Sequence, residues 1–198
     1  MKENSKKYVY RLTLSAIFIA LATVLSFIKI INMPLGGSVT LLSMLPIVML
    51  SCILGVKWGF VSAFAYSVIQ LILGITVDGL FAWGLTPLML IGTILLDYIL
   101  AFSILGIAGI FAKKGTIGMC IGVGIGIISR FICHFTSGCI IFKELEQFEI
   151  FGKLFENRPV LYSLGYNGLY MLPELLITVI AAVVLFNLPQ IKKLMNNF

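Results

Sequence analysis

Charged side chains are scarce in this 198-residue chain, at 11% of the residues, whereas 60% of the residues are hydrophobic. A soluble domain of this length needs far more polar surface, so a globular fold surrounded by water is excluded. Apolar runs of at least about 17 residues recur along nearly the whole chain and leave no room for a separate soluble domain. The sequence therefore predicts one integral membrane domain, residues 1–198, whose solvent is the lipid bilayer.

The chain also lacks the residue groupings that most enzymes and metalloproteins use. It has one histidine, no HExxH zinc motif, no GxSxG nucleophile elbow and no glycine-rich loop ending in GK[ST]. The cysteines lie within apolar segments and form no CxxC pair; they are Cys52, Cys120, Cys133 and Cys139. We therefore expect no enzyme activity, no bound metal and no cofactor, and any ATP that drives the protein must be bound by another chain.

Six apolar segments predict an all-α bundle of six transmembrane helices. The predicted spans are residues 11–31, 39–54, 58–77, 84–112, 117–142 and 161–186. The second span is short and contains Pro46, and the long fourth span has Pro87 near its start, so kinks or re-entrant turns are expected there. Glycines four residues apart in the fifth span let another helix backbone approach it closely.

The net charge of +6 and the pI of 9.2 are explained by membrane topology rather than by nucleic-acid binding. Nine basic residues fall on one side of the predicted bundle: Lys2, Lys6, Lys7, Arg11, Lys57, Lys113, Lys114, Lys192 and Lys193. Only Lys143, Lys153 and Arg158 fall on the other side. The positive-inside rule therefore predicts a multi-pass protein of a bacterial cell membrane with both termini in the cytoplasm.

Ionisable residues inside the predicted spans are informative, because a charge there costs several kcal/mol, and four stand out: Asp97, Arg130, His134 and Glu174. Counted from the outer helix ends at about 1.5 Å per residue, they lie roughly 12 to 20 Å deep, in one layer of the membrane. We expect Arg130 to pair with Glu174 or Asp97, because an unpaired buried charge is more costly than a paired one. The alternative is that these groups only hold helices together.

Helical spacing adds aromatic and amide groups to the same layer. His134 and Gly138 are four residues apart on the fifth span, and a polar stripe follows the sixth span through Tyr162, Tyr166, Asn167, Tyr170 and Glu174. Two carboxylates facing one guanidinium leave an excess negative charge if His134 is neutral. Such a cleft suits a flat heteroaromatic cation, although an interfacial aromatic belt also explains Tyr162 and Trp83.

At these residues the sequence resembles the thiamine-specific S components of energy-coupling factor (ECF) transporters. The resemblance is carried by RLTLSAIFIALATVLSF (11–27), GGSVTLLSMLPI (36–47), LLDYILAF (95–102), SRFICHFTSGCIIF (129–142) and YSLGYNGLYMLPELLIT (162–178). It implies a six-helix S-component fold that binds thiamine from outside and docks onto a shared transmembrane subunit with two ATPase subunits. Contact with that partner is implied for Ala16 and Ala20 on the first helix.

The resemblance also implies the thiamine-binding residues: Asp97, Tyr98, His134, Gly138, Tyr162 and Asn167. This chain departs from some members by having aspartate rather than glutamate at Asp97 and phenylalanine rather than tryptophan at Phe142. Its first external loop, NMPLGG, contains no aromatic residue.

Three other functions compete with this one. A solitary proton-coupled thiamine carrier would use Asp97, His134 or Glu174 as its titrating group, and an S component for a related heteroaromatic vitamin would use the same cleft. An intramembrane enzyme is disfavoured, because no pair of nucleophile and base is visible.

Overall fold

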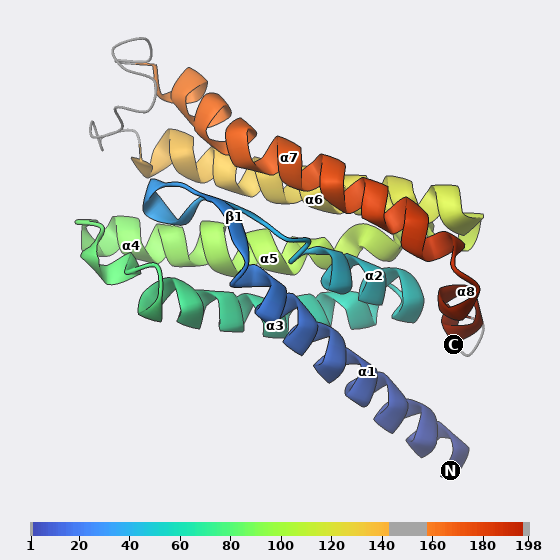
Figure 1. Ribbon diagram of the computed structural model, residues 1–198. Coiled ribbons are helices and arrows are strands. Elements are labelled where there is room, and N and C mark those ends of the chain that lie inside the picture. The colour runs from blue at the N-terminus through green and yellow to red at the C-terminus, as the bar shows by residue number, and fades with distance from the viewer. Residues whose placement is uncertain (1, 143–157, 196–198) are drawn as a thin grey trace.

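The long apolar runs form a bundle of helices, which the computed structural model describes for residues 2–142 and 158–195 (Figure 1). The membrane-length helices and their neighbours are α1 (Lys2–Ser26), α2 (Leu45–Leu54), α3 (Val56–Thr76), α4 (Pro87–Thr93), η3 (Ile94–Leu100), α5 (Ala101–Ser103), η4 (Ile104–Lys114), α6 (Gly115–Ile140), α7 (Pro159–Asn187) and α8 (Pro189–Met195). Short elements between them are β1 (Lys29–Asn32), η1 (Pro34–Gly36), β2 (Ser38–Thr40) and η2 (Leu80–Ala82).

The predicted number of six helical passes is confirmed. Within the described ranges, four continuous stretches are long and apolar enough to cross a membrane: Ser5–Ser26, Val56–Thr76, Pro87–Ile140 and Pro159–Asn187. The 54-residue stretch reverses direction at Gly115, whose positive φ of 75° suits glycine, and so makes two passes. The shorter apolar helix Leu45–Leu54 completes the six. The bundle is an all-helical integral membrane protein with one small hairpin added.

The first predicted span ends earlier than expected. Residues 27–31 were assigned to the first helix, but α1 stops at Ser26 and the chain continues as β1. β1 pairs in antiparallel fashion with β2, with Lys29 opposite Thr40 and Asn32 opposite Ser38. The hairpin satisfies the backbone groups that a helix would have satisfied, which any segment at membrane depth requires.

The second span is also shorter as a helix than its predicted range of 39–54. Residues 38–40 belong to β2, Leu42 has a positive φ of 63°, and the helix begins only at Leu45. Pro46 and Pro87 do not kink helices: each lies in the first turn of its helix, where the missing N–H costs no hydrogen bond.

The fourth pass is a continuous helical rod that changes its winding three times. α4 leads into η3, which is a π-helix, and α5 then leads into the 3₁₀-wound η4. Wide π-turns are often found at functional sites because they redirect side chains out of the regular helical register. Asp97 and Tyr98 both lie in this π-helical segment.

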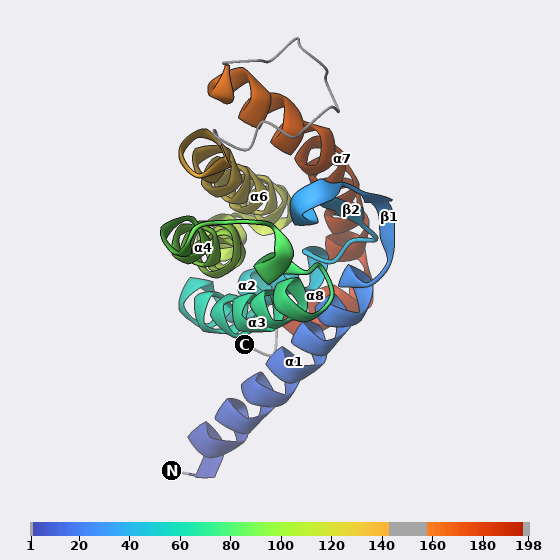
Figure 2. The same cartoon turned by 90° about the vertical axis from the view of Figure 1, so that its left-hand side faces the viewer.

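Close packing on small residues holds the rod against its neighbours. A Cβ added at Gly122 of α6 would lie 2.0 Å from the carbonyl oxygen of Ala108 in η4, so the glycines predicted to allow close approach do pack within this chain. α7 runs along α6, whereas α1 crosses the bundle obliquely and its first half projects beyond it (Figures 1 and 2).

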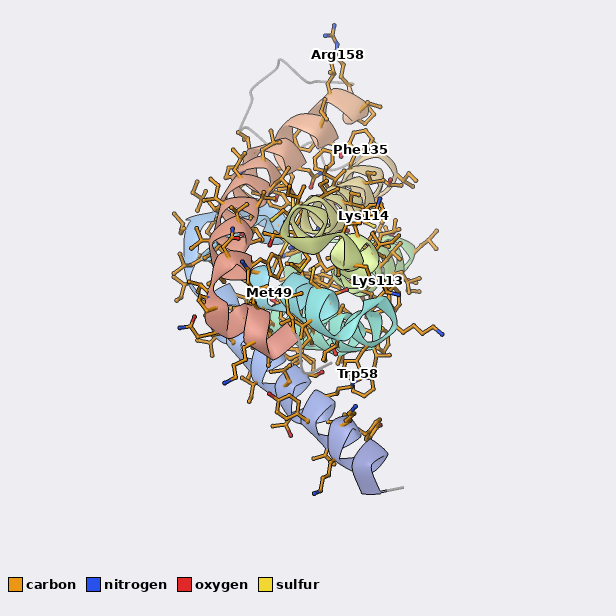
Figure 3. All side chains as sticks on the ribbon, turned by 90° about the vertical axis from the view of Figure 1, so that its right-hand side faces the viewer. Met49, Trp58, Lys113, Lys114, Phe135 and Arg158 are labelled. Carbon is orange, nitrogen blue, oxygen red and sulfur yellow. The ribbon has the colours of Figure 1, made fainter. Side chains whose placement is uncertain are left out.

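The two ends of the bundle differ in charge and in chain connection. The turn after η4 and helix α8 lie at one end, shown toward the viewer in Figure 3, where Lys113 and Lys114 project outward. The start of α7, with exposed Arg158, lies at the opposite end (Figures 1 and 3). Lys143 and Lys153 of the predicted external loop lie outside the described residues.

Candidate functional site

The hairpin and several helical segments enclose a cavity of about 970 Å³, a volume that includes its open mouth. Its lining comes mainly from the hairpin region, η3, α6 and α7, with further residues from α1, α3, α5 and the loop after α3. All six residues predicted to bind substrate line it, namely Asp97, Tyr98, His134, Gly138, Tyr162 and Asn167, and so do Arg130 and Glu174. The helical spacing therefore predicted correctly that these faces meet.

Asp97 is held in place by two donors from α6. One carboxylate oxygen is 2.8 Å from Nδ1 of His134, and the other accepts a hydrogen bond from the hydroxyl of Ser137. His134 and Ser137 are buried, and Asp97 is about one-sixth exposed toward the cavity. A carboxylate fixed by two hydrogen bonds keeps lone pairs free for a ligand in the same plane.

Arg130 lies one helical turn below His134 on α6. Its Nε–H donates to Nε2 of His134 over 3.2 Å, and its guanidinium carbon is 4.0 Å from the centroid of the Phe102 ring. The guanidinium therefore combines a directed hydrogen bond with a cation–π contact.

The predicted ion pair between Arg130 and Glu174 is not formed. Among the residues that the structure describes, the contacts within 4.0 Å between a carboxylate and a basic nitrogen are Lys29–Asp78 and His134–Asp97, and the second is an ion pair only when the histidine is protonated. Glu174 is 2% exposed and accepts instead from the backbone N–H of Thr40 and from its hydroxyl, at 2.6 Å for the latter. The hairpin supplies a free backbone N–H at this depth, which the interior of a regular helix does not offer.

Three tyrosines of α7 form a continuous aromatic wall. The rings of Tyr162 and Tyr166 are stacked with centroids 6.1 Å apart, and Tyr166 meets Tyr170 edge-on at 5.9 Å. The hydroxyl of Tyr166 donates to the carbonyl of Pro34 and accepts from the N–H of Gly37 over 3.3 Å. The wall is thereby fastened to the loop between β1 and β2.

Asn167 is buried behind this wall with its amide already engaged. Its Nδ2 donates to the carbonyl of Ser163 over 2.9 Å and to that of His134 over 3.4 Å, and its Oδ1 accepts from the hydroxyl of Tyr170 over 2.8 Å. The sequence predicted a direct substrate contact for Asn167. The geometry gives it the further task of joining α6 to the tyrosine wall.

The mouth of the cavity contains groups that sequence reasoning missed. Lys29 of β1 and Asp78, just after α3, form an ion pair that is about one-fifth exposed. Trp83 donates from Nε1 to the carbonyl of Asp78 over 3.0 Å, and its ring centroid is 6.5 Å from that of Phe142. The sequence could have indicated Lys29 as a site residue, since it is a charge inside the predicted first span. The position of Trp83 at the cavity depends on how the loops fold and has no such signal.

The formal charges around the cavity favour a cation. Three carboxylates line it, Asp78, Asp97 and Glu174, together with the cationic side chains of Lys29 and Arg130. One negative charge is thus in excess when all five are ionised and His134 is neutral. Aromatic rings beside an acidic group are the surroundings that a flat aromatic cation requires.

The remaining predicted site residues lie elsewhere. Ala16 and Ala20 are exposed on α1 and do not line the cavity. In the part of the chain that the structure describes, no group of three or more histidine, cysteine, aspartate or glutamate residues is placed to hold a metal ion.

An integral membrane protein whose helices enclose a net acidic cavity lined by polar and aromatic side chains belongs to the class of membrane solute-binding and transport proteins. The model of the thiamine transporter protein family matches residues 12–194, and the chain belongs to this family, which consists of transporters rather than enzymes. The thiamine transporter ThiT of Bacillus subtilis (strain 168) is 33% identical, over 92% of this chain and 93% of its own length.

The fold has a solved counterpart. The structure of ThiT from Listeria monocytogenes matches this chain with a TM-score of 0.71 at 24% identity, over 96% of this chain and 98% of that one. The S-component type of fold implied by the sequence resemblance is therefore confirmed.

Proposed function

We propose that this chain is the substrate-binding membrane subunit, or S component, of an ATP-driven ECF importer, and that it binds thiamine from outside the cell. The observation that carries the proposal is the carboxylate of Asp97, fixed by His134 and Ser137 at the wall of a net acidic cavity, in a chain of the thiamine transporter family. Thiamine is a flat cation with an aminopyrimidine and a thiazolium ring, and it matches this charge and shape.

Each proposed binding residue has a part suited to its position. Asp97 accepts hydrogen bonds from the ligand, and Tyr98, His134 and Tyr162 supply ring surfaces along the cavity. Gly138 lets α7 pack closely against α6 at the wall of the cavity, because a Cβ there would lie 2.2 Å from the hydroxyl oxygen of Ser163. Asn167 orients Tyr170 and lines the cavity beside it.

The proposed orientation places the cavity mouth outside and both termini in the cytoplasm. In support, the basic turn at Lys113–Lys114 and α8, with Lys192 and Lys193, gather at the end of the bundle remote from the start of α7 (Figures 1 and 3). Cytoplasmic ends of membrane helices carry an excess of lysine and arginine.

The proposed partners are a shared transmembrane ECF subunit and two ATPase subunits, which bind the ATP. Ala16 and Ala20 are one turn apart and exposed on α1, and small residues at this spacing let a partner helix approach closely.

Uptake of labelled thiamine tests the whole proposal, in host cells that lack thiamine transporters of their own. The chain is expressed alone, and then together with the shared subunit and the ATPases. We expect uptake only with the partners, and a collapse of that uptake when the ATPases are inactivated. Uptake by the chain alone that stops when the proton gradient is dissipated would show instead a solitary proton-coupled carrier.

A further inference from the structure

A directed chain of hydrogen bonds connects Arg130 to Asp97 through the histidine. Nε–H of Arg130 points at Nε2 of His134 over 3.2 Å, and Nδ1 of His134 lies 2.8 Å from Asp97. Ser137 donates to the other oxygen of Asp97. Arg130, His134 and Asp97, the three side chains that this series of hydrogen bonds connects, all line the cavity.

The protons in this chain can be placed by elimination. An arginine side chain cannot lose its proton in a protein and has no acceptor, so Nε2 of His134 has to be the acceptor of this bond. A neutral imidazole carries one proton, which must then be on Nδ1, and an imidazolium is excluded because it would set two N–H groups against each other. Nδ1–H therefore donates to Asp97, which is an acceptor in both of its bonds.

We propose that Arg130 is a positioning residue that keeps His134 neutral in the Nδ1–H form and thereby keeps Asp97 anionic and oriented for a cationic substrate. The proposal rests on the proposed function only for the identity of that substrate. An unblocked Nε2 would let His134 become an imidazolium, which would cancel the charge of Asp97 at the place where the cation binds.

Every element packed around His134 is consistent with this role. η3 presents Asp97, α6 presents Arg130 itself, and α7 presents the neutral ring of Tyr170, with its centroid 6.1 Å from that of the imidazole. The Phe102 ring lies against the guanidinium and limits the directions in which Nε–H can point. Since both ring nitrogens of His134 are engaged, the histidine offers the substrate its ring surface rather than a hydrogen bond.

Nitrogen-15 NMR of histidine-labelled protein in detergent micelles tests the assignment without any substitution. His134 is the single histidine of the 198-residue chain, so one pair of ring nitrogens gives the whole signal. We expect a protonated Nδ1 and an unprotonated Nε2 in the substrate-free protein at neutral pH. A protonated Nε2, alone or together with Nδ1, overturns the proposal.

Two substitutions separate the hydrogen bond of Arg130 from its charge. In Arg130→Gln the side-chain amide nitrogen stands as many bonds from Cα as Nε does, so a donor remains although the charge is lost. In Arg130→Met the side chain is as long as that of glutamine but has no hydrogen-bond donor. Charge alone predicts that both variants bind cationic thiamine more tightly than the wild type, because each loses a nearby positive charge.

The proposal predicts that the two variants differ from each other in thiamine affinity. Arg130→Met gains a proton on Nε2 and binds thiamine about 10- to 100-fold more weakly than Arg130→Gln, which keeps the Nδ1–H form. Lys114→Met is the matched control, since Lys114 also lies over a phenyl ring, that of Phe111 at 5.0 Å, but at the other end of the bundle. Equal affinities and equal histidine signals in the two Arg130 variants would refute the role.

A failure of this proposal can be distinguished from a failure of the proposed function. If the folded wild type gives the Nδ1–H signature but does not bind thiamine, the proposed substrate is wrong and the Arg130–His134 assignment stands. If Arg130→Met does not fold, the wild-type spectrum and Arg130→Gln still decide the assignment.

Discussion

At the scale of single residues, the cavity depends on polar groups that are costly to bury and are therefore bonded to one another. Both oxygens of Asp97 are matched, by His134 and Ser137, whereas Glu174 has one oxygen bonded to Thr40 and its other oxygen buried without a hydrogen-bond partner among the described residues. A carboxylate at this depth without such donors would cost several kcal/mol. The bonds leave Asp97 facing the cavity, whereas Glu174 serves to hold the hairpin.

Asp97→Asn removes the charge of the binding carboxylate and keeps its shape. His134 can still donate to the amide oxygen, so we expect the variant to fold with little change in thermal stability. Thiamine binding should weaken by about 10- to 100-fold, because a charge-assisted bond in a low-dielectric site is worth about 1–3 kcal/mol. Calorimetry on the purified protein measures this, and an affinity within about twofold of the wild type would argue against the assignment of Asp97.

Asn167→Ala should weaken binding through the tyrosine wall. The change leaves the buried hydroxyl of Tyr170 without its acceptor, at a cost of about 1–3 kcal/mol, and we expect about tenfold weaker thiamine binding. Asn187→Ala is the control, because Asn187 is an exposed asparagine of the same helix that bonds only within its own turn.

A double-mutant cycle with Tyr170→Phe shows whether Asn167 acts through Tyr170. The two effects on thiamine affinity should then be clearly less than additive. Fully additive losses would mean that Asn167 contacts the substrate independently of Tyr170.

At the scale of elements, the cavity requires α6 and α7 to approach closely. Gly138 makes this possible, since a Cβ there would lie 2.2 Å from the hydroxyl oxygen of Ser163. Ser163 in turn donates to the carbonyl of Phe135 over 2.7 Å and cannot simply swing away. The same pair of helices carries His134 and Asn167, so their spacing sets the shape of the site.

Gly138→Ala should therefore destabilise the protein and impair binding together. Overpacking of this kind costs about 1–3 kcal/mol, and we expect a lower thermal midpoint in detergent and weaker thiamine binding. Gly124→Ala on the same helix meets no atom within 4 Å and should be neutral or slightly stabilising. Replacing Ser163 by glycine in the Gly138→Ala background should recover part of the loss; no recovery would mean that Ser163 is not the obstacle.

Elements were predicted from the sequence where the hydrophobic signal was strong. α3, α6 and α7 lie within a few residues of their predicted bounds, because each is a long apolar run closed by glycine, proline or charge. The end of α1 was misplaced because Ile30 and Ile31 are as apolar as a helix interior. Only the pairing of β1 with β2, across a loop with Pro34 and Gly36, makes them a strand.

The partners of the buried charges were beyond sequence reasoning for a related reason. Helical spacing correctly brought Asp97, His134 and Asn167 to one cavity. Which charge meets which depends on the π-winding of η3 and on the hairpin that brings Thr40 to Glu174. Neither feature has a periodic signal, so the sequence predicted Glu174 or Asp97 as the partner of Arg130, whereas the structure shows His134.

At the scale of the whole molecule, the proposed function assigns binding and energy coupling to different parts. The cavity lies among the hairpin, α3, η3, α6 and α7, whereas Ala16 and Ala20 lie on exposed faces of α1. In a transporter whose ATP is bound by other subunits, these two functions should be separable by substitution.

Ala16→Leu combined with Ala20→Leu should abolish thiamine uptake with the partner subunits while leaving thiamine affinity of the purified chain unchanged. The larger side chains keep a partner helix from approaching α1 and touch no residue of the cavity. Co-purification with the shared subunit and calorimetry measure the two properties. Full uptake by the double variant would place the partner contact elsewhere.

The central claim is that an anionic, aromatic cavity within the membrane receives a flat organic cation. Its most direct test is a calorimetric titration of the purified, folded chain with thiamine and, separately, with its aminopyrimidine and thiazolium fragments. The account predicts saturable binding of one thiamine per chain and much weaker binding of either fragment, because only the whole molecule combines the charge with both rings. The absence of saturable thiamine binding, or equally tight binding of one fragment, would contradict it.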